Sequence, residues 1–214
     1  MSIAFCLVII LGGIRLCLTH FFINLEYRTL DFPTDTSGFS DQERQTYAYV
    51  SVDYLLGKIL EEEYQHLSFS NGEPLFNQRE LSHMRDVRDL TLIALNIWYV
   101  CLLILIAGIL LALKLEWQRE VWHAGRSASL VILFMIVAIL LGVAVSFDEL
   151  FTAFHSIFFE GDTWLFYPSD ALIRLFPTPF WVNVFIAVGI FSLTCSFLLY
   201  FFCRRMLVPT KKEA

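Results

Sequence analysis

The chain has 214 residues, a formal net charge of −6 and 57% hydrophobic residues, whereas only 17% of its residues are charged. Soluble domains usually carry about a quarter charged residues, so this composition disfavours a soluble enzyme, and its hydrophobicity excludes intrinsic disorder. The acidic balance also disfavours a nucleic-acid partner. With a mean hydropathy of +0.63, the sequence indicates an integral membrane protein.

Four apolar stretches are long enough to cross a hydrocarbon core of about 30 Å, which needs roughly 20 residues of helix. They cover residues 2–25, 90–113, 127–147 and 180–203, and the last three contain no Asp, Glu, Lys, Arg or His. The first stretch lacks the basic start and the small-residue cleavage site of a signal peptide. We therefore expect four retained transmembrane helices.

Charge placement predicts the topology. The connection over residues 26–89 has a net charge of −7 and that over 148–179 has −4, whereas residues 114–126 and 204–214 are positive. Because short loops rich in Lys and Arg remain in the cytoplasm, we expect both termini inside and both acidic loops outside. All five cysteines lie in or beside the spans, so the outer loops are not a disulfide scaffold.

The predicted fold class is an all-α membrane domain of four transmembrane helices with a small extracytoplasmic domain. The two outer loops would form this domain from helical and from irregular or strand segments. The predicted parts, in chain order, are transmembrane helix 1 (1–25), the extracytoplasmic loop domain (26–89), transmembrane helix 2 (90–113), a cytoplasmic loop (114–126), transmembrane helix 3 (127–147), an aromatic-rich extracytoplasmic loop (148–179), transmembrane helix 4 (180–203) and a cytoplasmic tail (204–214).

The first outer loop contains two helix starts. Ser40 and Glu43 have the spacing of a capping box, and the helix that they start should end near Gly57. Asn77 and Glu80 repeat this spacing. No helix breaker follows them, so we expect one helix from about residue 78 directly into the second span.

This second helix gives His83 a position at the membrane surface. His83 lies seven residues before Leu90, on the order of 10 Å outside the hydrocarbon boundary. Arg79 and Asp86 share its helix face.

The second outer loop is unusually aromatic, since a quarter of residues 148–179 are Phe, Trp or Tyr. Such a segment is typical of the membrane interface. Asp148 is expected to cap an amphipathic helix that carries His155 on the same face as Asp148. Residues 164–166, with the sequence WLF, are expected to anchor the loop in the interface.

His83 and His155 stand just outside the ends of the second and third spans, each with an acid on its own helix face. This arrangement predicts a shared site for acid/base or nucleophilic chemistry by imidazole near neutral pH. No two histidines have the i, i+4 spacing of a zinc-binding helix, so we expect no metal and no cofactor. The alternatives are that His83 belongs to a solvated, charged start of its helix and that His155 is a polar contact of an amphipathic interfacial helix.

Arg15 is an ionisable residue inside a predicted span, which makes it a functional candidate. One interpretation is that it faces a polar cavity and holds carbonyl groups of the substrate. The other is that it snorkels to the membrane surface or bonds Asn96 or backbone carbonyls.

Three segments carry a resemblance to a known family. The sequences FNQRELSHMRDV over residues 76–87, FHSIFF over 154–159 and WLF over 164–166 resemble the lipoprotein intramolecular transacylase (Lit) family of Gram-positive bacteria. The four-span plan with two outer loops is similar as well. The resemblance implies a multi-pass acyltransferase of the bacterial cell membrane, with a diacylglyceryl-modified lipoprotein as substrate and membrane lipids as neighbours.

The resemblance also implies the reaction. The acyl chain on the sn-2 oxygen of the glycerol would move to the α-amino group of the N-terminal cysteine and give an N-acyl lyso-form lipoprotein. His83 and His155 would be the catalytic residues, one as base and the other as stabiliser or proton donor, with a transient acyl-histidine as an open alternative. Asp86 and Asp148 are candidates to orient the imidazoles.

Two functions of other classes remain open. A non-catalytic interaction or assembly protein would use the aromatic loop as a docking surface and would tolerate loss of both histidines. A metal-dependent membrane hydrolase would lose activity with a chelator. The sequence contains no pattern that predicts the oligomeric state.

Overall fold

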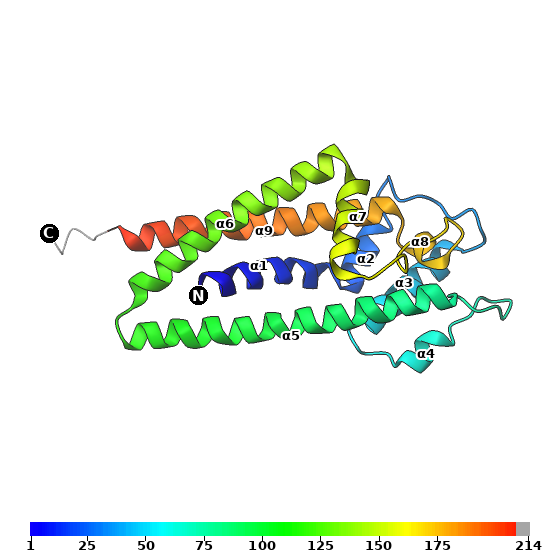
Figure 1. The fold of residues 1–214 in the computed structure, drawn as a ribbon, viewed down its shortest axis with the longest axis horizontal. Helices are drawn as coiled ribbons and strands as arrows, with labels where there is room; N and C mark the ends of the chain where they lie inside the picture. Colours follow the sequence, from blue (N-terminus) through cyan, green and yellow to red (C-terminus); the bar gives the residue numbers. More distant parts are fainter. Residues whose placement is uncertain (209–214) are drawn as a thin grey trace. The chain divides into compact units, whose positions relative to one another are not determined.

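A computed structural model describes residues 1–208; residues 209–214, the end of the predicted cytoplasmic tail, lie outside the described residues. Within residues 1–208 the structure has nine α-helices and no β-strand (Figure 1). The helices are α1 (Ser2–Cys17), α2 (His20–Glu26), α3 (Asp41–Leu55), α4 (Glu61–Gln65), α5 (Gln78–Lys114), α6 (Gln118–Val145), α7 (Phe147–Phe158), α8 (Ala171–Leu175) and α9 (Thr178–Leu207).

The helices fall into two compact units. The first, here called the membrane unit, contains residues 1–15 and 94–142 and the described residues from 186 onward. The second, here called the histidine unit, contains residues 16–93 and 143–185. Helix α5 is continuous through 37 residues and contributes to both units.

Three helices, α5, α6 and α9, are long and apolar enough to cross a membrane, and α1 with α2 makes a fourth candidate as a bent pair. The chain is therefore a mostly helical protein with three or four candidate spans. Large apolar side chains on the three long helices, such as Leu103, Phe134 and Leu198, are exposed, as expected where lipid is the solvent.

Small residues allow close helix contacts within the membrane unit. A Cβ atom on Gly125 of α6 would lie 2.8 Å from the sulfur of Cys203 on α9, and one on Gly189 of α9 would lie 2.8 Å from Leu140 of α6. The indole nitrogen of Trp98 on α5 donates a hydrogen bond of 3.0 Å to the carbonyl of Val8 on α1. Helices in lipid associate through such close packing and hydrogen bonds.

The histidine unit contains the helix predicted after Ser40. Ser40 and Glu43 form the reciprocal capping box, and α3 ends at Leu55, two residues before Gly57. Gly57 has φ of +71°, a left-handed conformation that favours glycine. Both predicted signals are confirmed.

A buried ion pair joins the two predicted outer loops inside this unit. The guanidinium of Arg174 on α8 donates two hydrogen bonds, of 2.8 and 2.9 Å, to the carboxylate of Asp35. Their side chains are 10% and 4% exposed. Arg44 of α3 is also buried and donates to the carbonyl of Pro33. The first loop is thus stabilised by the second loop, without a disulfide.

Two expectations about the helices are wrong. The first apolar stretch is two helices, because Thr19 leaves the helical conformation and its hydroxyl caps α2 by accepting from the amide of Phe22. Ser146, and not Asp148, is the N-cap of α7; Asp148 lies in the first turn. Irregular segments are present in the predicted outer loops, but the expected strand is not confirmed: the described residues contain a single β-bridge between Ser68 and Pro74, and Pro74 has no N–H to donate to a ladder.

Candidate functional site: a histidine pair under aromatic side chains

Two helices of the histidine unit bring His83 and His155 together. Their ring centroids are 6.0 Å apart and their ring planes differ by 26°. Each residue is only 8% exposed. The structure therefore brings the two predicted residues together, although 72 positions separate them in the sequence.

The first turn of α5 positions His83. The side chain of Asn77 accepts hydrogen bonds from the amides of Arg79 and Glu80, and the carboxylate of Glu80 accepts one of 2.8 Å from the amide of Asn77. Glu80 also accepts a hydrogen bond of 2.8 Å from the amide of Leu172 at the start of α8. One side chain thus fixes the starts of two helices, one turn before His83.

Burial disfavours the charged form of the Glu80 carboxyl group. Its side chain is 1% exposed, and desolvation raises the pKa of its carboxyl group, while the backbone hydrogen bonds oppose this rise.

Helix α7 positions His155 and fixes its tautomer. The Nδ1 atom of His155 lies 2.8 Å from the carbonyl oxygen of Phe151, one turn earlier. A carbonyl oxygen can only accept a hydrogen bond, so Nδ1 carries the proton. The Nε2 atom of neutral His155 therefore has a free lone pair.

Aromatic rings enclose both imidazoles. Phe159 and Phe166 meet the ring of His83 edge-on, at centroid distances of 4.9 and 5.3 Å. The ring of Trp164 lies 4.8 Å from that of His155. These three residues belong to the connection after α7, and we call residues 159–167 the aromatic strap.

This apolar environment disfavours charge on the histidines. Burial, followed by the neighbouring His155, lowers the pKa of His83 to about 4. Burial also lowers the pKa of His155, against the hydrogen bond to the Phe151 carbonyl, which raises it. Both imidazoles are consequently neutral at pH 7, the form that can accept a proton.

One polar atom of the site has no partner. The Nδ1 atom of His83 is buried and makes no hydrogen bond within residues 1–208. Buried polar atoms are rarely left unpaired. This atom therefore offers an open hydrogen-bonding position inside the site.

The acids predicted to face the histidines lie elsewhere. Asp86 and Asp148 are exposed, and neither makes a hydrogen bond to His83 or His155 in the described chain. A carboxylate does contact another histidine, since Nε2 of His20 lies 2.9 Å from Asp53. Arg15 is half-buried on α1 and belongs to the membrane unit.

Sequence reasoning missed two parts of this site. Residues 164–166 were expected to anchor the loop in the interface, but Trp164 and Phe166 lie against the histidines. The contact with the Phe151 carbonyl was also missed, although the i, i+4 spacing within one helix is its signal. No spacing rule places Trp164, because its position depends on a turn at Gly161 with φ of +63°.

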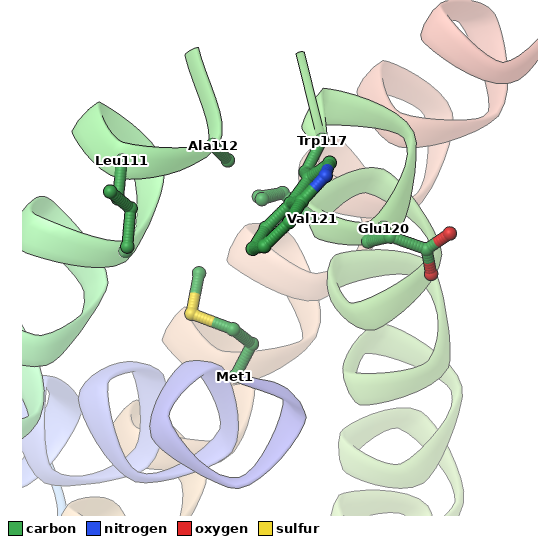
Figure 2. Close-up of a pocket in the computed structure, with 7 residues that line it drawn as sticks. Met1, Leu111, Ala112, Trp117, Glu120 and Val121 are labelled. Atoms are coloured by element: carbon green, nitrogen blue, oxygen red, sulfur yellow. The ribbon is translucent and has the colours of Figure 1, made fainter. Parts of the chain in front are cut away.

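A separate pocket lies in the membrane unit. Figure 2 shows Met1 and Trp117 on its wall, and its volume is about 170 Å³. Its lining is almost entirely apolar, with Glu120 as the single acidic residue: Met1, Gly108, Leu111, Ala112, Trp117, Glu120 and Val121. It contains no histidine and no nucleophilic side chain. Within residues 1–208, no group of three or more His, Cys, Asp or Glu side chains is arranged to hold a metal ion.

Comparisons with known proteins agree with this architecture. The family model described as lipoprotein intramolecular transacylase Lit matches residues 1–181. An uncharacterized protein of Aquifex aeolicus (strain VF5) is 30% identical over 187 residues, which cover 87% of this chain and 83% of that protein.

Solved structures of the membrane integral lipoprotein intramolecular transacylase Lit from Bacillus cereus have the same fold. One has a TM-score of 0.77 at 21% identity and covers 100% of this chain and 94% of its own. Another, in which one histidine is replaced, has a TM-score of 0.69 at 20% identity and covers 96% and 88% of the two chains.

Proposed function

Because the chain belongs to the lipoprotein intramolecular transacylase (Lit) family and is therefore an acyltransferase, we propose that the His83–His155 pair carries out its reaction on a diacylglyceryl lipoprotein. The α-amino nitrogen of the N-terminal cysteine attacks the carbonyl carbon of the sn-2 ester. The bond from this carbon to the glycerol oxygen breaks, and the proton lost by the amine ends on that oxygen. The product is an N-acyl lyso-form lipoprotein.

The observation that carries this proposal is the buried histidine pair, in which burial lowers the pKa of both imidazoles. An α-amino group has a reference pKa of about 7.7 to 8.0 and is mostly protonated at neutral pH. It becomes a nucleophile only after a base removes its proton, and a neutral imidazole is such a base. The amine and the ester belong to one molecule, so holding them together supplies much of the rate.

The hydrogen bond of His155 favours this residue as the base. Nε2 has the free lone pair, and the positive charge that forms on protonation is stabilised by the Nδ1–H donated to the Phe151 carbonyl. His83 remains neutral, since burial lowers its pKa to about 4. It is suited to interact with the tetrahedral intermediate and with the departing glycerol oxygen.

The remaining predicted roles stay proposals. Asp86 and Asp148 would act on the imidazoles only after a rearrangement, because both are exposed. Arg15 would hold substrate carbonyls from the membrane unit. With termini inside and the histidine unit outside, as the charge distribution favours, the site would lie at the outer surface of the membrane.

The test is expression in a host whose lipoproteins are otherwise diacylated, followed by mass spectrometry of an N-terminal lipoprotein peptide. The intact protein should move one acyl chain to the cysteine nitrogen. His83→Gln and His155→Gln should each reduce the product at least about 100-fold, the usual contribution of acid–base catalysis. His66→Gln is the matched control, since His66 is exposed and bonds the carbonyl of Glu62.

Two outcomes would contradict the proposal. Acyl transfer that survives both histidine substitutions would exclude the pair as catalysts. Loss of activity on treatment with a chelator would favour the metal-dependent alternative.

A further inference from the structure

The aromatic strap packs on the histidine pair and leaves little of either residue exposed. Each histidine is 8% exposed. Phe159 and Phe166 pack on His83, and Trp164 packs on His155. The two reactants, an amine and an ester, must displace at least part of this cover.

The strap is fixed at its ends. The amide of Phe159 donates to the carbonyl of His155, which joins the strap to the last turn of α7. The amide of Tyr167 donates a hydrogen bond of 2.8 Å to the carboxylate of Asp170, the N-cap of α8.

Between these ends, the one polar contact to another helix in the described chain comes from Arg79. Its guanidinium donates a hydrogen bond of 3.1 Å to the carbonyl of Leu165 and lies 5.1 Å from the ring centroid of Tyr167. Arg79 stands on α5, one turn before His83, and is exposed. A hydrogen bond at an exposed position is weak enough to open and close reversibly.

We infer that the aromatic strap, held closed by Arg79, excludes water from the His83–His155 pair and so directs the acyl group to the amine of the lipoprotein; this inference rests on the proposed function. A base able to activate an amine can also activate water. In that side reaction, the water oxygen bonds the acyl carbon and the ester bond to glycerol breaks. One water proton passes to the glycerol oxygen and a free fatty acid leaves.

Arg79 is therefore a positioning residue for the strap, and Trp164 and Phe166 are the barrier itself. Their rings present no hydrogen-bonding group to a water molecule except the Trp164 indole N–H. Water has a concentration far above that of any lipoprotein. Exclusion of water is thus what distinguishes a transferase from a hydrolase at such a site.

The test measures two products from one lipoprotein in detergent: the N-acyl lyso form and free fatty acid. Arg79→Met should raise the ratio of fatty acid to N-acyl product about two- to tenfold, the factor that corresponds to the net contribution of one typical hydrogen bond. Arg79→Lys, which keeps a donor, should restore most of the original ratio. Trp164→Ala should raise the ratio as well.

The matched control is Arg85→Met. Arg85 lies on the same helix and is exposed, but it pairs with Glu61 and does not contact the strap. A variant that is merely unstable loses both products in parallel and leaves their ratio unchanged.

Imidazole modification by diethyl pyrocarbonate gives a readout that is independent of acyl transfer. Arg79→Met should increase the modification rates of His83 and His155 relative to that of the exposed His66. If neither these rates nor the product ratio change in Arg79→Met and Trp164→Ala, the strap is not a water barrier. If the wild-type protein transfers no acyl group, the proposed function fails, and the modification rates still test the cover.

Discussion

His83 is a buried imidazole that can serve as a neutral catalytic group but lowers the stability of the fold in acid. Its imidazole is buried between Phe159, Phe166 and His155. It therefore remains neutral at a pH of about 6.5, at which an exposed histidine is half protonated. Such a residue lowers the tolerance of the fold to acid.

We expect His83 to make the histidine unit less stable as the pH falls from 6.5 to 4. In this window the unfolded chain binds a proton that the folded chain, with its pKa of about 4, does not. The free energy of unfolding should fall by about 3 kcal/mol, since one pKa unit corresponds to about 1.4 kcal/mol. Thermal unfolding of purified wild type and His83→Gln at several pH values measures this difference. Equal slopes in both proteins would contradict the assigned pKa.

Asp35 should be essential for the stability of the same unit. Arg174 holds the pKa of its carboxyl group far below the usual range, with help from the amides of Phe39 and Ser37. Asp35→Asn leaves the guanidinium buried without a counter-charge, and loss of one partner of a buried pair costs about 3–5 kcal/mol. Unfolding in denaturant measures the loss. Asp31→Asn, at an exposed position nearby, should change stability by less than about 0.5 kcal/mol.

At the scale of helices, close packing in the membrane unit depends on particular glycines. A Cβ on Gly189 would meet three side-chain atoms of Leu140 within 3.2 Å, whereas one on Gly108 would meet only the flexible end of Met1. An alanine at position 189 would therefore displace most of the Leu140 side chain, whereas one at position 108 would displace only the end of the Met1 side chain.

We predict that Gly189→Ala destabilises the membrane unit by about 1–3 kcal/mol, the usual cost of overpacking. Gly108→Ala should have little effect, because the end of the Met1 side chain can take another rotamer. Thermal unfolding in detergent compares the two variants. A larger loss in Gly108→Ala than in Gly189→Ala would show that Met1, and not Leu140, is fixed.

Helix boundaries were predictable where a local signal sets them. The box of Ser40 and Glu43, the pair Asn77 and Glu80, and the absence of a breaker before Leu90 correctly gave α3 and the start of α5. The break at Thr19 was not predictable from hydropathy, because it depends on the Thr19 hydroxyl, which accepts a hydrogen bond from the amide of Phe22 in place of a backbone carbonyl.

The histidine pair was predictable only in part. Periodicity placed His83 and His155 on helices near the membrane surface, and the structure brings them together. Their partners were not predictable, because the contacts come from an irregular segment whose path has no periodic signal. The expected acids, Asp86 and Asp148, followed from helical spacing alone, which does not state which face meets the neighbouring imidazole.

For the whole molecule, the distribution of charge predicts the orientation in the membrane. Asn71→Cys, in an acidic and exposed segment, should react with a membrane-impermeant thiol reagent in intact cells. Gln118→Cys, at the start of α6, should react only after the membrane is opened. Each substitution is made in a variant whose five native cysteines are replaced by alanine. The opposite labelling pattern would reverse the proposed topology.

The continuity of α5 makes bilayer thickness a variable of the reaction. His83 and the apolar stretch that starts at Leu90 belong to one uninterrupted helix, so a fixed rise of about 10 Å separates His83 from the start of that stretch. A bilayer thicker than the apolar stretch thins around this helix or draws its flanking residues inward, which brings His83 closer to the ester groups of the surrounding lipid. The acyl-chain length of the host membrane would therefore change the depth of His83 relative to the ester groups of its substrate.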